Sequence, residues 1–528
     1  MATLASGLSS AVLVRGRRRL PRGLLLASCL VAALLLLPLV FLLLEARQVG
    51  WGQVSSLLFR PLTATLLGNL IELAVVVTAL AAVIGTGAAW LVERSDLPAR
   101  RVLALALVLP LAIPDFVVAF GWVSVLPAVS GYGGAVLVMT AGLFPLVYLP
   151  VAASLRGADP TQEETARTLG LGPWRTFWHV TMRQARPTIL AGCLLVSLAL
   201  LAEYGAFEIL GYQTFTTEIF TEFQVGFNTP AACALSLVVV LLGLLVLAGE
   251  GTLRDRGRVA RAAHNSRRVI ARQRLGAWRW PAVGGVLLLI AVALGMPIGV
   301  IGYWLVRGGS STLPQSASVA DAAFHTVVYS AAAAAAATVM ALPVALLAVR
   351  SPIRAVRLLE RSTYIVQGLP GLVIALALVF FALHYLAFIY QTSGLLIAAY
   401  SILFFPLAYV AVRASALQAP VGLEEVASSL GRSPWAVRWR VTLPLVAPGL
   451  AAAFCLVFLS AVTELTATLV LVPTGAETLA TQFWAFTGQV SYGAAAPYAA
   501  AMIAISIVPG ILLGYWFDRR HSQRGVVE

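Results

Sequence analysis

The sequence predicts an all-α integral membrane protein of about twelve transmembrane helices, arranged as two homologous six-helix halves. Composition, the spacing of apolar runs and an internal repeat predict this fold class. Of the 528 residues, 60% are hydrophobic and only 11% are charged, whereas a soluble domain has about 25% charged residues. Apolar runs of roughly 20 residues, long enough to cross a bilayer, recur along the chain and leave little length for a soluble domain.

The apolar runs form two groups of six on either side of an arginine-rich linker. The first group lies at about 24–44, 67–91, 102–126, 134–154, 188–209 and 231–249, and the second at about 281–305, 323–348, 362–386, 393–413, 445–466 and 495–516. We interpret the first run as a retained span, because it is longer than a signal-peptide core and no clear cleavage site follows it. The predicted organisation is a first half at 1–250, a linker at 251–280 and a second half at 281–528.

The net charge of +14 is explained by topology. The chain contains no lysine, so all 36 basic residues are arginines, and they gather in alternate loops between the apolar runs. This pattern places both termini in the cytoplasm and argues against a nucleic-acid-binding patch. A standard phosphate-binding P-loop needs a lysine, so any ATP that drives this protein must be hydrolysed on another subunit.

Cysteine and histidine spacing indicates no further site. The four cysteines lie far apart inside apolar runs, which favours small buried side chains over a disulfide framework. The five histidines show no metal-ligand spacing, so we expect no metal site.

A polar segment occurs twice, as EETARTLGLGPWRTFWHVTMRQARPTI at 163–189 and EEVASSLGRSPWAVRWRVTLPLVAPGL at 424–450. Nine positions of the first copy recur at a constant offset of 261: Glu164, Ala166, Leu169, Gly170, Pro173, Trp174, Val180, Thr181 and Pro187 match Glu425, Ala427, Leu430, Gly431, Pro434, Trp435, Val441, Thr442 and Pro448. The same offset pairs Glu203 with Glu464, and an offset of 256 pairs Arg94 with Arg350 and Pro114 with Pro370. Each half has an even number of spans, so the halves run parallel and can face each other across a central pathway.

Each repeated segment predicts a short helix, a sharp turn and a second helix on the cytoplasmic side. Gly170 and Gly431 stand where a left-handed residue ends a helix. Pro173 and Pro434 suit the first turn of the next helix, with Ser433 as an N-cap. The first short helix has an acid near its N-terminus, and the turn holds this helix away from the membrane. Both features suit docking into a groove of a partner protein.

These residues resemble the EAA loop of type I ATP-binding-cassette importer permeases. The resemblance assigns ATPase coupling to six residues: Glu164, Ala166, Gly170, Glu425, Ala427 and Gly431. The first copy departs from the family pattern at Thr165, Met182 and Arg183. The resemblance implies a transport permease of the bacterial inner membrane rather than an enzyme, with no cofactor in this chain. The implied partners are membrane lipid, a periplasmic or lipid-anchored solute-binding protein, and two ABC ATPase subunits that carry ATP and Mg.

The segments 202–220 and 464–484 look like their counterparts in ferric iron permeases, which form fused two-half chains of similar length. The resemblance therefore implies ferric iron import, with thiamine or a small phosphonate-like solute as the alternative. From the sequence itself, an acid near membrane depth predicts a functional site, so we expect the substrate pathway to include four acids: Glu203, Glu464, Asp115 and Glu72. A gradient-driven secondary transporter is the rival class, but it gives the repeated cytoplasmic segment no role.

Overall fold

The structure, a computed structural model, describes residues 22–48, 51–157, 160–226, 228–255, 273–308, 314–351, 356, 359–360 and 365–523. Within these ranges the chain is helical throughout, apart from connecting turns and one isolated bridge between Ser95 and Gln273. The arginines at 15–19 and most of the predicted linker, residues 256–272, lie outside the described residues.

The described part contains nine helices that are long and apolar enough to cross a membrane. Two further spans are formed by bent helix pairs, and the shorter apolar helix Gly371–Tyr385 accounts for the remaining predicted run. All twelve predicted apolar runs therefore correspond to helices, which confirms the predicted fold class.

The first half begins with a long helix and ends with another. Its elements are α1 (Arg22–Gln48), α2 (Trp51–Leu58), α3 (Pro61–Arg94), α4 (Arg100–Ala106), η1 (Leu109–Ala112), α5 (Asp115–Val123), α6 (Gly131–Leu143), α7 (Pro145–Arg156), α8 (Pro160–Thr168), α9 (Pro173–Thr176), the π-helical η2 (Phe177–Thr181), α10 (Met182–Ala202), α11 (Gly205–Ile209), α12 (Phe215–Gln224) and α13 (Thr229–Asp255).

The second half repeats this order. Its elements are η4 (Gly276–Trp278), α14 (Arg279–Ile290), the π-helical η5 (Ala291–Gly295), α15 (Met296–Arg307), α16 (Ser316–Arg350), α18 (Gly371–Tyr385), η6 (Ala387–Ile389), α19 (Ser393–Leu403), α20 (Phe405–Gln418), α21 (Val421–Ser429), α22 (Pro434–Val437), the π-helical η7 (Arg438–Thr442), α23 (Leu443–Val462), α24 (Thr466–Leu471), α25 (Leu479–Gly488) and α26 (Tyr492–Gln523).

The predicted run 102–126 is not one continuous helix. The chain bends by 92° between its two helical parts, Arg100–Ala112 and α5. Pro114 lies at the break, in extended backbone, and disfavours helical backbone at the preceding residue. Pro370 precedes α18 in nearly the same conformation, so the repeated prolines begin equivalent helices in the two halves.

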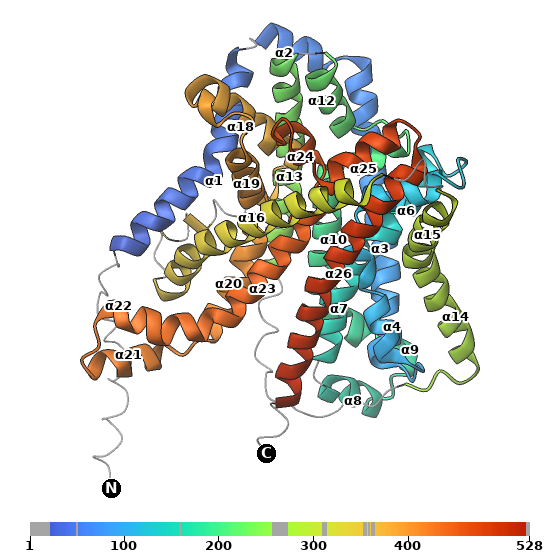
Figure 1. Cartoon of the computed structure of the whole chain (residues 1–528). Helices are drawn as coiled ribbons and strands as arrows, with labels where there is room; N and C mark the ends of the chain where they lie inside the picture. Colours follow the sequence, from blue (N-terminus) through green and yellow to red (C-terminus); the bar gives the residue numbers. More distant parts are fainter. Residues whose placement is uncertain are drawn as a thin grey trace.

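The two halves exchange their first helices. Helix α1 packs against α16 and α18 of the second half, and α15 packs against α5 of the first half. One apolar core accordingly joins Leu35 and Leu42 of α1 to Val373 of α18, and the other joins Ile301 of α15 to Phe120 of α5. In Figure 1 the blue α1 lies beside α18 of the second half, whereas α15, with η5 before it, lies near α6 of the first half. The halves are therefore interlocked.

Small residues allow the spans to approach closely. Gly85 of α3 faces the backbone of α7, where an added Cβ would lie 2.8 Å from the Phe144 carbonyl oxygen. Gly192 of α10 faces the same helix, and an added Cβ there would lie 2.7 Å from the Val147 Cα. Such contacts between small residues are typical of membrane helices, which cannot rely on the hydrophobic effect to associate in lipid.

The two ends of the molecule carry different elements. Figure 1 shows α8 and α21 apart from each other at one end, where α26 also finishes. Helices α2, α12 and α25 lie at the opposite end. We call these the loop end and the outer end.

Candidate coupling loops and central acidic residues

Both repeated segments form the predicted helix–turn–helix. Gly170 has φ +83° and Gly431 has φ +77°, which are left-handed values that favour glycine. The Leu171 amide donates to the Ala166 carbonyl at 3.0 Å, and the Arg432 amide donates to the Ala427 carbonyl at 3.2 Å. These bonds close each first helix in a Schellman turn, as the glycine positions predict.

The second short helix of each loop begins at its proline. Pro173 is the first residue of α9 and Pro434 is the first residue of α22. The Ser433 hydroxyl accepts a hydrogen bond from the Ala436 amide at 3.3 Å, which confirms the predicted N-cap.

The tips of the loops expose large apolar side chains. Leu169 is 78% exposed and its counterpart Leu430 is 77% exposed. Glu164, Gly170, Glu425 and Gly431 are also exposed, whereas Ala166 is buried and Ala427 is half-buried. Each tip therefore presents an exposed apolar side chain and a nearby acid at the loop end. Two such similar surfaces suit two similar protein partners.

A buried ion pair fixes the first loop to its half. Glu163, in the first turn of α8, lies 3.3 Å from Nη2 of Arg94 at the end of α3. The Thr181 hydroxyl, at the end of η2, donates to Oε1 of Glu163 at 2.8 Å. The side chains of Arg94 and Glu163 are only 5% and 9% exposed. We call Arg94, Glu163 and Thr181 the first anchor.

The second loop has the same arrangement. Nη2 of Arg350, at the end of α16, donates to Oε1 of Glu424 at 2.6 Å, and the Thr442 hydroxyl donates to the same oxygen at 3.0 Å. These side chains are slightly more accessible, at 14% for Arg350 and 19% for Glu424. We call Arg350, Glu424 and Thr442 the second anchor.

Glu203 and Glu464 lie just beyond the ends of α10 and α23 and cap the short helices that follow. Oε1 of Glu203 accepts from the Ala206 amide at 2.8 Å, and Oε1 of Glu464 accepts from the Ala467 amide at 2.9 Å. Capping of α11 and α24 explains how carboxylates are tolerated so close to two apolar spans.

The two acids meet at the boundary between the halves. A Cβ added to Gly205, next but one to Glu203, would lie 2.7 Å from Cδ2 of Leu465, which follows Glu464. Glu203 is also within electrostatic range of both Glu464 and Asp115. The structure thus brings together three of the four acids predicted for the substrate pathway.

Asp115 has no acidic counterpart in the second half. It is the first residue of α5, directly after Pro114, and packs against Gly142 of α6. The equivalent position after Pro370 is Gly371, where an added Cβ would lie 2.9 Å from Oε1 of Glu464. Among the described residues, no group of three or more His, Cys, Asp or Glu side chains is arranged to hold a metal ion.

Aromatic side chains connect the halves on the outer side of these acids. The Tyr204 ring stacks on Phe220 of α12 at 4.3 Å and lies 5.7 Å from Trp484 of α25. Phe116 of α5 lies 5.4 Å from Phe483, which is fully buried. In this conformation aromatic contacts of α5 and of Tyr204, just before α11, with α25 join the halves near the outer end.

Glu72 lies apart from the other acids. Its side chain is exposed on α3, beside Tyr132. At the outer end, Glu222 of α12 pairs with Arg60 at 3.4 Å. Burial and the neighbouring Glu222 raise the pKa of Glu218, while Arg60 opposes the shift. Arg60, which directly precedes α3, thus partly offsets the negative charge of Glu222 at the outer end.

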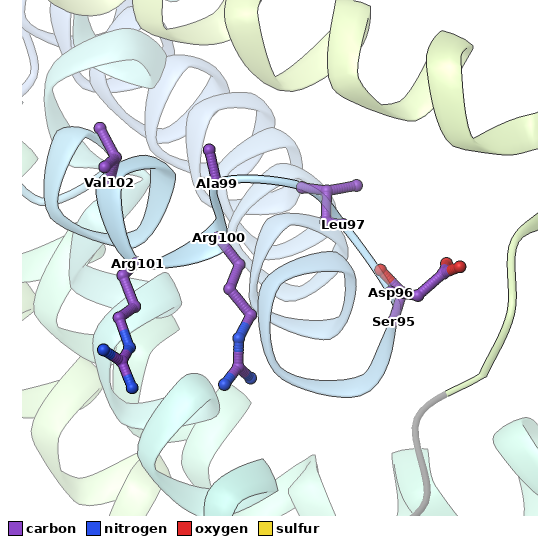
Figure 2. A pocket seen from close by; sticks show the side chains of 7 residues that line it. All are labelled: Ser95, Asp96, Leu97, Ala99, Arg100, Arg101 and Val102. Carbon is purple, nitrogen blue, oxygen red and sulfur yellow. The ribbon is translucent and has the colours of Figure 1, made fainter.

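An open pocket of about 530 Å³ lies beside the first anchor, in the segment Ser95–Val102. Figure 2 shows Arg100 and Arg101 pointing the same way from the start of α4, while Asp96 extends to the other side. Oδ1 of Asp96 accepts from the Leu275 amide at 3.0 Å, so this segment is tied to the residues before α14.

Sequence reasoning missed the anchors. The EAA resemblance selects Glu164 and Glu425 from the two Glu-Glu pairs, but the preceding acids, Glu163 and Glu424, make the buried contacts. The repeat contained a signal for the anchors, because Thr181 recurs as Thr442 at the offset of 261 and Arg94 recurs as Arg350 at the offset of 256.

Comparison with known proteins agrees with this architecture. The family described as "Binding-protein-dependent transport system inner membrane component" matches residues 81–253 and 337–525, one segment in each half. The Fe(3+)-transport system permease protein FbpB 2 of Haemophilus influenzae is 38% identical over 498 residues, which cover 94% of this chain and 98% of the relative.

Shorter relatives match parts of this chain. The sulfate transport system permease protein CysT of Escherichia coli is 30% identical over 43% of this chain and 89% of its own length. The molybdenum transport system permease protein ModB of Escherichia coli is 31% identical over 30% of this chain and 80% of its own length. The chain therefore belongs to the family of binding-protein-dependent transport system inner membrane components, as a multi-pass transport permease.

Proposed function

We propose that this chain is the membrane permease of an ATP-driven importer for ferric iron. The observation that carries the proposal is similarity to an Fe(3+)-transport permease along nearly the whole of both halves, whereas the sulfate and molybdenum relatives cover less than half of the chain. The chain would have no cofactor of its own and would perform no bond chemistry.

The duplicated loops support the proposed source of energy. Two exposed helix–turn–helix tips of matching shape offer docking sites for two ABC ATPase subunits, which would bind ATP and Mg. Glu164, Ala166 and Gly170 would contact one subunit, and Glu425, Ala427 and Gly431 the other. Both termini would then lie in the cytoplasm, on the same side as the loops.

The central acids support the proposed substrate pathway. A periplasmic or lipid-anchored binding protein would deliver iron at the outer end, and opening of the aromatic contacts would admit it to Glu203, Glu464 and Asp115. Carboxylate oxygens suit a hard cation such as ferric iron. Glu72, at the surface of α3, remains a predicted contact at the periphery of this pathway.

Uptake by cells tests the substrate. The chain is produced with its cognate ATPase and binding protein in bacteria that lack other ferric uptake, and accumulation of radioactive ferric iron is measured. We expect uptake that requires the binding protein and is not reduced by excess thiamine or methylphosphonate. Uptake of labelled thiamine or methylphosphonate in place of iron would assign the permease to that alternative solute.

The source of energy separates the proposal from a secondary transporter. We expect vanadate, which traps ABC ATPases, to stop uptake, and we expect vesicles supplied with ATP to retain uptake after an ionophore has collapsed the ion gradients. The opposite pattern would identify a gradient-driven carrier and leave the loops without their proposed partners.

A further inference from the structure

The two anchors each join three elements at one carboxylate. In the first anchor, Glu163 belongs to the loop helix α8, Arg94 ends the long span α3, and Thr181 directly precedes the span α10. The second anchor joins α21, α16 and α23 through the corresponding residues. A displacement of either loop helix therefore acts on two spans of its half at once.

We propose that the anchors are the joints through which loop movement is transmitted to the substrate pathway. Helix α10 begins beside Thr181 and ends beside Glu203, and α23 begins beside Thr442 and ends beside Glu464. A continuous helix is a rigid connection over this distance, so rotation of a loop reaches the central acids directly. This inference rests on the proposed function, because it takes docked ATPase subunits as the source of the movement.

Local geometry supports a special role for the anchor threonines. Thr181 and Thr442 each end a five-residue π-helical segment, η2 and η7, at the same place in the two halves. π-helical turns are rare and are frequent at functional sites, because the wider turn redirects side chains at a cost in helix regularity. Both copies retain this irregularity, and in both it directs the hydroxyl to the anchor carboxylate.

Burial distinguishes the anchors from ordinary surface pairs at the same end. Arg156 also pairs with an acid, Glu93, at 2.9 Å; the Glu93 side chain is 11% exposed, but that of Arg156 is 60% exposed. Surface pairs contribute little, whereas loss of one partner of a buried pair leaves an uncompensated charge. Arg156 therefore provides a matched control for Arg94.

The first anchor has an additional connection. The Gln273 amide donates to the Arg94 carbonyl at 2.9 Å, and the Asp96 amide donates to the Gln273 carbonyl at 3.2 Å. These bonds connect the end of α3, beside the pocket of Figure 2, to the chain that leads into α14. The first anchor is thus connected to both halves.

The first test measures solute transported per ATP hydrolysed. The chain is reconstituted in lipid vesicles with its cognate ATPase and binding protein, as wild type, Arg94→Gln, Arg350→Gln, the double variant and the control Arg156→Gln. We expect the double variant to bind the ATPase and hydrolyse ATP normally, while solute transported per ATP falls about tenfold or more, because loops and spans move independently. The control should match wild type, and Arg94→Lys should recover part of the loss.

Two results would overturn the proposal. If solute per ATP is unchanged in the double variant, the anchors do not transmit movement. If ATPase binding and uptake are lost together, the anchors only maintain the shape of the docking surface. Should Arg94→Gln fail to reach the membrane, Thr181→Val removes the hydroxyl at nearly constant volume and is judged by the same two outcomes.

Hydrogen exchange of the chain alone, in detergent, separates this inference from the proposed function. We expect amides of α8 to exchange about tenfold faster in Arg94→Gln than in wild type or Arg156→Gln, because the loop helix is no longer held. Unchanged exchange would overturn the anchor. If exchange is faster in Arg94→Gln but the wild-type complex shows no ATP-driven uptake, the proposed function is overturned. The anchor then remains as a structural joint.

Discussion

Gly170 and Gly431 stand in open space, because a Cβ added at either position would meet no atom of the described residues within 4 Å. Crowding therefore does not require glycine there. The positive φ angles do, because a side chain in left-handed backbone contacts its own peptide groups. The sequence was sufficient to predict this conformation, since a glycine between two short amphipathic segments has few other roles.

Replacing both glycines with valine should abolish uptake. A β-branched residue in left-handed backbone costs at least about 1–2 kcal/mol per site, so each loop should leave its docking shape. Uptake of radioactive iron should fall to background, while the amount of permease in the membrane stays near wild type. Gly172, which is exposed and lacks a positive φ, offers the control Gly172→Val; uptake retained in the double variant would contradict the docking role.

Replacing Glu203 and Glu464 with glutamine should lower cation uptake by about tenfold or more while the ATPase still binds, because the cation loses carboxylate ligands. Glutamine keeps an oxygen that can accept the capping hydrogen bonds from Ala206 and Ala467, so the change removes charge and preserves the caps. Uptake and ATPase co-purification are measured together, with the exposed Glu477→Gln as control. Equal uptake in variant and wild type would identify the two acids as helix caps alone.

At the scale of elements, the sequence predicted every apolar run but not the shape of each span. The run 102–126 is apolar throughout, so hydropathy alone cannot reveal a 92° bend. Pro114 is the local signal, yet prolines such as Pro187 and Pro343 lie inside helices that continue past them. Whether a proline bends or breaks a helix depends on packing partners that a single sequence does not show.

The aromatic contacts of α5 and Tyr204 with α25 predict a measurable gate. Each aromatic pair is worth about 0.5–1.5 kcal/mol, so losing one shifts a two-state equilibrium by roughly two- to tenfold. Trp484→Ala should therefore raise ATP hydrolysis severalfold in the absence of binding protein, because the outer end opens more readily. Trp280, which is 71% exposed on α14, provides the control Trp280→Ala; unchanged basal hydrolysis in Trp484→Ala would show that this contact does not limit opening.

At the scale of the whole molecule, the repeat identified equivalent residues but not the helix exchange. The constant offset of 261 shows that two segments have similar sequences. It does not show which half a given helix packs against. That information lies in side-chain complementarity, such as the contact between Phe41 of α1 and Phe381 of α18 at 5.1 Å. The boundaries 1–250, 251–280 and 281–528 remain predictions, because packing crosses them.

The exchange predicts that the halves assemble without a peptide connection. Cutting the chain between residues 262 and 263 and producing both pieces together should give a complex that co-purifies and retains most of its uptake, because α1 and α15 bury apolar surface in the opposite half. Co-purification through a tag on one piece is the measurement. Pieces that also lack α1 should fail to assemble; full assembly without α1 would contradict its role in the interface.

Asp115 and Gly371 occupy equivalent positions and differ in charge. In a permease built from two identical subunits, every carboxylate near the symmetry axis occurs twice. The number of carboxylates around that axis is therefore always even. Joining the halves in one polypeptide removes that restriction, since each copy can change without the other. Gene fusion thereby permits an odd number of acids around the axis, and the described part of this chain brings three together: Asp115, Glu203 and Glu464.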